Sequence, residues 1–227
     1  ALNGITYSVS EEADFYIDAI KPDASGSYFD LHTPDGVYKN QFFNQLGMHN
    51  LSNALVALAM ASKAGLQLQD LVKSLATFPG VQRRLQVLIN NDNRVLIDDY
   101  AHHPTEIKAV YETLKLSFPT EEKCVVFQPH LFSRTQDFMK DFARVLSLFD
   151  RVLLLDVYAA RELPIAGVSS AALKEMISGP SVELITKKEL ANRLSLVEER
   201  IIVLLGAGDI GVEVEAIKHK LLYDEAL

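Results

Sequence analysis

The sequence predicts an α/β protein: a doubly wound, mostly parallel sheet preceded by a smaller part of antiparallel strands and helices. Three observations predict this. After residue 82, short apolar runs rich in β-branched residues recur, and helical stretches separate most of them. Before residue 80, a hairpin pattern is followed by helical periodicity. The 227 residues are enough for one or two domains, and we place the boundary in the stretch "FPGVQRR", near Gln82.

The first part, residues 1–81, starts with β pattern and ends with helices. Residues 14–20 alternate weakly between apolar and polar side chains. Residues 27–43 read as a hairpin with Pro34-Asp35-Gly36 at the turn. Apolar residues at helical spacing follow over 50–65, where the final glycine is expected at the C′ position. A second short helix is stopped by a Pro-Gly pair.

The second part, residues 82–227, alternates strands with helices. A strand that is followed by a helix and then another strand predicts parallel pairing. The "NNDN" stretch over 90–93 is the exception, because it reads as a hairpin turn between the first two strands. The predicted strands are 85–89, 95–97, 124–127, 152–155, 182–185 and 201–205.

Helix starts are marked by residue types at fixed spacing. Pro104 suits the first position of a helix, where its missing N–H costs nothing. Ser133 and Gln136 fit a capping box. Thr186 and Glu189 fit another.

The totals exclude several functions. The formal net charge is −8 and Lys/Arg do not cluster, so no nucleic-acid partner is expected. No apolar run is long enough to cross a bilayer and the first residues are not a secretory signal, so no membrane partner is expected. The single Cys124 forms no internal disulfide and fits a cytoplasmic protein as a buried thiol. The oligomeric state is not predicted.

Polar residues follow four of the predicted parallel strands. In an open α/β sheet, ligands bind beyond the carboxyl ends of the strands, so these residues are expected at one edge. Arg134 opens a helix beside a histidine, which suits a carboxylate or a phosphate. The edge therefore predicts a site for a charged small molecule. It comprises Asp98, Asp99, Tyr100, His102, His103, Gln128, His130, Arg134, Asp156, Tyr158 and the stretch "GAGDIG".

Two motifs admit alternatives. His102 and His103 could cap the helix at Pro104, with capping favoured for His103; a zinc site is not expected, because no further ligands occur at recognisable spacing. "GAGDIG", Gly206 to Gly211, matches G-x-G-x-x-G, but it is not followed by a second strand with an acidic end. We therefore reject NAD binding and expect a tight strand-to-helix turn.

Two residue pairs before the sheet also have alternative readings. Asn50 and Asn53 share one helix face near its start and either cap the helix or reach a ligand. Arg83 and Arg84 are either a solvated pair or grip a nucleotide from the linker.

Six motifs in order resemble those of the Mur ligases, the amide-bond-forming enzymes of peptidoglycan synthesis and hence of cell shape and division. The resemblance extends from about Asp14 to about Gly211. Within the family, the sequence most resembles the member that joins L-alanine to UDP-N-acetylmuramate, and the "QPH…SRT" segment favours it over the murein tripeptide-recycling ligase. The motifs are "GMHNLSNALVALAMA", "FPGVQRRL", "IDDYAHHPTEI", "FQPHLFSRT", "DVYAARELPIAGVSS" and "GAGDIG".

The resemblance implies a domain division and a reaction. Residues 1–81 would be the last part of the central ATPase domain, and residues 82–227 the Rossmann-like C-terminal domain. The chain has no G-x-x-x-x-G-K-[ST] and starts at Ala1, so we expect a fragment, inactive alone. ATP with Mg²⁺ would phosphorylate the carboxylate of UDP-N-acetylmuramate, and the amine of L-alanine would attack the acyl phosphate. No metal ligand is expected within this chain, because those ligands would lie upstream.

The resemblance also implies roles for individual residues. Asn50, Asn53, Arg84, Asp98 and Asp99 would lie at the nucleotide, with Asp99 on its ribose. A second group would surround the alanine, with His102 as the catalytic residue: Tyr100, His102, His130 and Arg134. Leu131 replaces an arginine of some relatives, so Arg134 would be the one arginine left for the alanine carboxylate. The linker near Gln82 would be the hinge of domain closure. The alternative from another class is a non-catalytic nucleotide-binding module.

Overall fold

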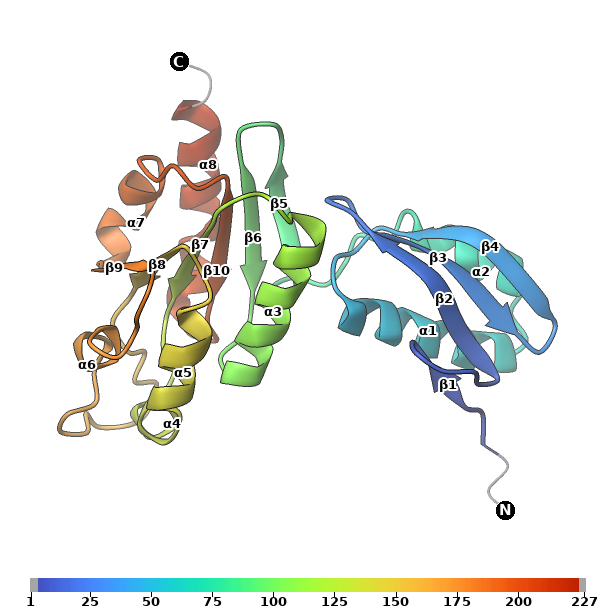
Figure 1. The fold of residues 1–227 in the computed structure, drawn as a ribbon, viewed down its shortest axis with the longest axis horizontal. Helices are drawn as coiled ribbons and strands as arrows, with labels where there is room; N and C mark the ends of the chain where they lie inside the picture. Colours follow the sequence, from blue (N-terminus) through green and yellow to red (C-terminus); the bar gives the residue numbers. More distant parts are fainter. Residues whose placement is uncertain (1–3, 225–227) are drawn as a thin grey trace. The chain divides into compact units, whose positions relative to one another are not determined.

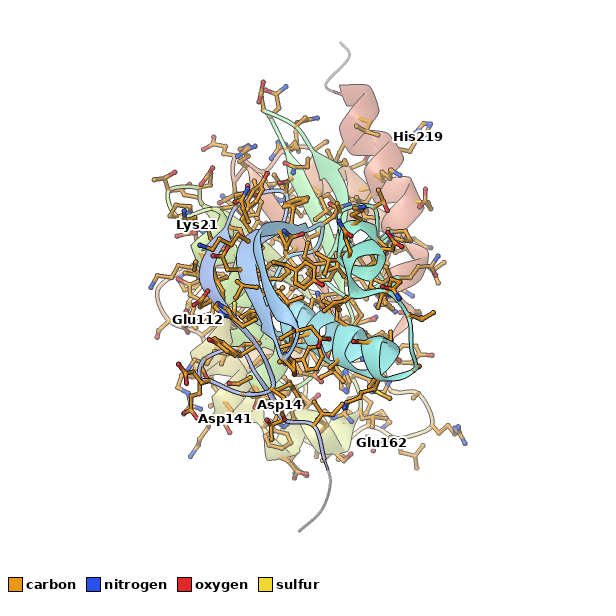
Figure 2. All side chains as sticks on the ribbon, turned by 90° about the vertical axis from the view of Figure 1, so that its right-hand side faces the viewer. Asp14, Lys21, Glu112, Asp141, Glu162 and His219 are labelled. Carbon is orange, nitrogen blue, oxygen red and sulfur yellow. The ribbon has the colours of Figure 1, made fainter. Side chains whose placement is uncertain are left out.

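The computed structural model describes residues 4–224, and of residues 223 and 224 only the backbone. The chain forms two compact units. One comprises residues 1–80 with 113–119, and the other residues 81–112 with 120–227 (Figure 1). Lys21 of the first unit and Glu112 of the second are exposed, and both are labelled in Figure 2. No helix within 4–224 is both long and apolar enough to cross a membrane.

The first unit is a four-stranded sheet with two helices. The strand order is β1-β2-β3-β4, with β1 parallel to β2 and the others antiparallel. Alternate residues of β2 and β3 are buried together with one face of α1 and α2, which gives the unit its own core. The elements are β1 Tyr7–Ser8, β2 Phe15–Pro22, β3 Ser27–Thr33, β4 Gly36–Phe43, α1 Met48–Lys63 and α2 Leu68–Leu75.

The predicted hairpin and helix end of this unit are confirmed. β3 and β4 pair across the turn, where Thr33 faces Gly36. At the end of α1, Gly65 has φ +90, a conformation that costs glycine no Cβ clash. Its N–H donates to the carbonyl of Ser62, and Leu66 N–H donates to that of Ala61, which is the Schellman arrangement.

The second unit is built on a six-stranded sheet of order β5-β6-β10-β7-β8-β9. β5 pairs antiparallel with β6 through the predicted hairpin turn, and the other pairs are parallel. The predicted α/β fold class is therefore confirmed. The strands are β5 Gln86–Asn90, β6 Val95–Asp99, β7 Lys123–Phe127, β8 Arg151–Leu154, β9 Ser181–Leu184 and β10 Ile201–Leu205.

Helices cover both faces of this sheet (Figure 1). Ile202 and Leu204 of β10 pack in one cluster with Leu190 of α7 and Ile217 of α8. α3 and α5 lie on the opposite face (Figure 1). The helices are α3 Pro104–Ser117, α4 Phe132–Asp137, α5 Met139–Leu146, α6 Ser170–Lys174, α7 Lys187–Leu194 and α8 Val214–Asp224, with a 3₁₀ turn, η1, at Asp209–Val212.

The predicted helix starts have mixed outcomes. α3 begins at Pro104, and Thr186 with Glu189 forms the predicted capping box of α7. The capping box predicted for Ser133 and Gln136 is wrong. α4 begins two residues earlier than that box requires, so Leu131, which has no side-chain acceptor, occupies the N-cap position. The Ser133 side chain instead donates to the carboxylate of Glu162.

Candidate functional site

The carboxyl ends of the central strands are in register. Leu205 at the end of β10 pairs with Asp99 of β6 on one side and with Phe127 of β7 on the other. Phe127 pairs in turn with Leu154 of β8. The connections after these strands therefore leave the sheet at one level. This confirms that the polar residues predicted at the strand ends share one edge.

Four rings from three of these connections form a row. The ring centroids of Tyr100 and His102 lie 5.6 Å apart, and those of His102 and His130 lie 6.1 Å apart. Tyr158 stacks on the other side of His130 at 5.6 Å with an interplanar angle of 25°. A parallel bridge between the backbones of His130 and Tyr158 holds these two rings together. The tertiary structure thus brings Tyr100, His102 and His130 together.

Arg134 extends this row with a positive charge. Its Nη1 atom lies 3.5 Å from Nδ1 of His130, one helical turn earlier in the chain. Among the ion pairs of the described residues, none involves Arg134. Burial, and then the charges of Arg134 and His102, lower the pKa of His130. These effects favour the neutral imidazole over the imidazolium beside the Arg134 guanidinium.

Glu162 holds the start of α4 from the loop after β8. Its carboxylate accepts hydrogen bonds from the backbone N–H and the hydroxyl of Ser133. These two bonds lower the pKa of Glu162, with the side-chain bond contributing most. Because Arg134 is the next residue, the Glu162 carboxylate restrains the backbone that carries the guanidinium.

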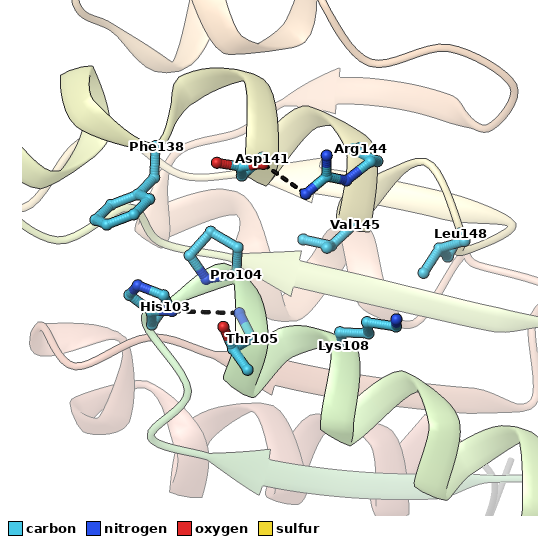
Figure 3. Close-up of a pocket in the computed structure, with 9 residues that line it drawn as sticks. All are labelled: His103, Pro104, Thr105, Lys108, Phe138, Asp141, Arg144, Val145 and Leu148. Atoms are coloured by element: carbon cyan, nitrogen blue, oxygen red, sulfur yellow. Dashed lines mark hydrogen bonds and ion pairs between the residues drawn. The ribbon is translucent and has the colours of Figure 1, made fainter.

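His103 caps α3, as the sequence favoured. Its Nδ1 accepts a bond from Thr105 N–H, and its own N–H donates to the carboxylate of Glu106, so a capping box starts the helix. The His103 ring also packs edge-on against Phe138 at 4.5 Å. It lines a groove of about 660 Å³ between the start of α3 and α5, which Figure 3 shows. The side chain of His103 therefore caps α3, whereas the ring of His102 belongs to the row of rings.

Arg83 is tied into the second unit and is not a solvated residue. Its guanidinium donates to the carbonyl of Gly206, pairs with the Asp98 carboxylate at 3.3 Å and lies 4.8 Å from the centre of the Tyr100 ring. Arg84, the neighbouring residue, is exposed. Of the two arginines, Arg84 is thus the one whose side chain is accessible to a ligand.

Asp98 and Asp99 are almost completely buried, with 2% and 6% of their surface exposed. Burial raises the pKa of Asp98 and the neighbouring Asp99 charge adds to this, whereas Arg83 lowers it. The two carboxylate oxygens of Asp99 accept bonds from the backbone N–H groups of Leu85 and Ala101 at 2.7 Å. In this structure Asp99 therefore joins the linker to the loop after β6.

The glycines after β10 form the predicted tight turn into η1. Gly206 has φ +152 and offers its carbonyl to Arg83. A Cβ on Gly208 would lie 2.5 Å from the Gln128 side chain and 2.7 Å from the Tyr158 ring. Only glycine at 208 lets this turn lie so close to the row of rings.

The remaining predicted positions lie elsewhere. Asn50, in the first turn of α1, donates its side-chain N–H to the carbonyl of Leu46 and does not cap the helix, while Asn53 is exposed. Cys124 is fully buried, and burial raises the pKa of its thiol to about 12. Among the residues described, no group of three or more His, Cys, Asp or Glu side chains is placed to hold a metal ion.

The sequence placed Gln128 and Tyr158 at this edge, because each follows a predicted strand, but it gave them no individual role. Glu162 was not predicted at all. Gln128 is buried and bonds both Asp209 and the backbone of Ile210. Glu162 lies 29 residues after the serine that it binds, and no spacing rule connects them.

Each of the two units contains a region that matches a known protein family. The family described as "Mur ligase, glutamate ligase domain" matches residues 83–208, and the "Mur ligase middle domain" matches residues 1–61. The solved structure of UDP-N-acetylmuramate-alanine ligase from Thermotoga maritima superposes with a TM-score of 0.75 at 25% identity, covering 98% of this chain and 48% of that one. A murein peptide ligase from Psychrobacter arcticus shares the fold, with a TM-score of 0.56 at 21% identity and with 95% of this chain and 45% of that one covered.

Two curated relatives carry the same name. UDP-N-acetylmuramate–L-alanine ligase of Christiangramia forsetii is 48% identical over 98% of this chain and 49% of its own length. That of Flavobacterium psychrophilum is 46% identical over 97% of this chain and 49% of its own. The chain spans about half the length of the curated relatives it matches. The family match over residues 83–208, together with the strand order and the in-register site edge, shows that this chain belongs to the Mur ligase family.

Proposed function

We propose that this chain is part of an ATP-dependent ligase that joins L-alanine to UDP-N-acetylmuramate in peptidoglycan synthesis. The observation that carries the proposal is the row of Tyr100, His102 and His130 with Arg134 at its end. A small amino acid presents one carboxylate and one amine. The row offers one guanidinium and a set of imidazoles for them, and the two curated relatives described above are named for this reaction.

Each of the four residues has a proposed role. Arg134 binds the alanine carboxylate, since it has no carboxylate partner among the described ion pairs and its planar fork matches a carboxylate. His102 accepts the proton that the attacking amine loses. His130 and Tyr100 line the alanine. Leu131 stands where a second arginine would add a bond, so Arg134 carries the carboxylate alone.

The nucleotide contacts are proposed for each unit separately. Asn50 and Asn53 are assigned on the first unit, where Asn53 is exposed. Arg84 is assigned to the ATP phosphates on the second, because its side chain is accessible whereas that of Arg83 is engaged. Asp98 and Asp99 are assigned to the nucleotide side of the loop after β6, which their buried contacts hold in place.

The domain assignment and cofactors follow from the family. We assign residues 1–81 to the C-terminal part of the central ATPase domain and residues 82–227 to the C-terminal domain, in agreement with the matched ranges. ATP with Mg²⁺ supplies the phosphoryl group that activates the sugar carboxylate, and we assign the Mg²⁺ ligands to a part of the enzyme upstream of this chain. The protein is proposed to act in the cytoplasm, where its nucleotide substrates are.

The experiment is an assay of ADP release by the full-length protein with UDP-N-acetylmuramate as the carboxylate substrate. A panel of L-amino acids and free murein tripeptide are supplied in turn as the amine substrate. The proposal predicts activity with UDP-N-acetylmuramate and a preference for alanine. Activity only when tripeptide replaces the amino acid would identify the recycling ligase instead. Nucleotide binding without ADP release under any condition would favour the non-catalytic module.

A further inference from the structure

The His102 ring is held by oxygen acceptors. Its Nδ1 atom lies 2.9 Å from the carbonyl oxygen of Tyr100 and 3.5 Å from Oε2 of Glu106. A carbonyl oxygen and an ionised carboxylate accept hydrogen bonds and donate none. Nδ1 therefore carries the hydrogen, and in the neutral ring the lone pair lies on Nε2.

The Glu106 carboxylate is held in place before any ligand binds. Its Oε2 atom accepts bonds from the backbone N–H groups of His102 and His103 at 2.9 and 3.1 Å. Glu106 also lies in the first turn of α3, where the helix macrodipole favours a negative charge. One carboxylate thus fixes the helix start, the loop backbone and the imidazole together.

The groups around the His102 ring divide into two sides. Tyr100 and Glu106 come from the loop and helix that carry His102. His130 comes from the connection after β7, with Arg134 behind it. Glu106 places a carboxylate 3.5 Å from Nδ1 of His102, whereas His130 and Arg134 bring no negative charge to the ring.

We propose that Glu106 is a positioning residue of the ligase reaction. Together with the Tyr100 carbonyl it holds His102 as the Nδ1–H tautomer, so that Nε2 accepts a proton from the attacking amine. This inference rests on the proposed function. As the amine nitrogen bonds to the acyl carbon, phosphate leaves with the electrons of the C–O bond, and the nitrogen's proton moves to Nε2. The imidazolium that forms is stabilised by the Glu106 carboxylate.

The first test is Glu106→Gln in the full-length enzyme. Glutamine keeps an oxygen for the two N–H groups but removes the charge. We expect kcat to fall about 10- to 100-fold, part of the 10²–10⁴-fold that general base catalysis contributes, while KM for alanine and ATP changes less than about twofold. Glu112→Gln, an exposed position on the same helix, is the matched control and should leave kcat unchanged. A loss confined to KM, or an equal loss in the control, would overturn the proposal.

The second test reads the tautomer directly. Long-range ¹H–¹⁵N spectra of ¹⁵N-histidine-labelled chain, at a pH where His102 is neutral, should show its Nδ1 protonated. In Glu106→Ala the protonated fraction of Nδ1 should fall, because the negative charge 3.5 Å from Nδ1 is gone. An Nε2–H signal in the wild type would refute the assignment. If the full-length protein ligates no amino acid, the proposed function fails, and these spectra still decide whether Glu106 sets the tautomer.

Discussion

Replacing Arg134 by alanine tests the carboxylate site most directly. The guanidinium is part-buried beside His130, and none of the ion pairs found within residues 4–224 engages it. A charge-assisted hydrogen bond contributes about 1.5–3 kcal/mol, and each 1.36 kcal/mol is a factor of ten. Arg134→Ala should therefore raise KM for alanine about 10- to 150-fold. KM for ATP should change less than about twofold, because the nucleotide contacts are assigned to other residues.

The assay is steady-state ADP release by the full-length enzyme, with alanine and ATP varied in turn. Arg134→Lys keeps the charge but loses the planar fork, so its KM for alanine should lie between those of the wild type and the alanine variant. Arg144→Ala, on the next helix, is the control: Arg144 is exposed and forms a surface ion pair with Asp141 on its own helix. Equal increases in both KM values, or none, would refute the assignment.

Three further outcomes are expected. The pKa of His130, measured by NMR titration, should lie below the ordinary value of about 6.5, because burial and neighbouring charges lower it. The stability that this lowered pKa contributes is present above pH 6.5 and is lost as the pH falls through the folded-state pKa. His130→Asn should therefore reduce the loss of unfolding free energy over this pH range. Leu204→Ala, at a fully buried position of the central strand, should cost about 2–5 kcal/mol in urea unfolding, and Leu196→Ala, at a 72% exposed position, less than about 0.5 kcal/mol. Gly208→Ala should lower ligase activity through its clash at the row of rings, whereas Gly4→Ala, which meets no atom within 4 Å, should not.

Local sequence determined the elements of this protein. Strands 95–97, 124–127 and 201–205 were predictable because buried parallel strands are continuous apolar runs. Pro104, Gly65 and the Thr186–Glu189 pair marked helix ends because backbone geometry at those positions admits few residue types. The convergence of polar residues at one edge also followed from the sequence, since parallel strands end on the same side.

The tertiary structure decided which of those residues meet. The last strand, β10, inserts between β6 and β7, and no local pattern encodes that order. This order brings the Gly206 carbonyl to the guanidinium of Arg83, 123 residues earlier in the chain, while Arg84 stays exposed. The sequence alone does not distinguish these two adjacent arginines. Sequence identifies side chains that can do chemistry. Their partners depend on long-range packing, because contacts such as Ser133–Glu162 join segments that only the fold brings within hydrogen-bonding distance.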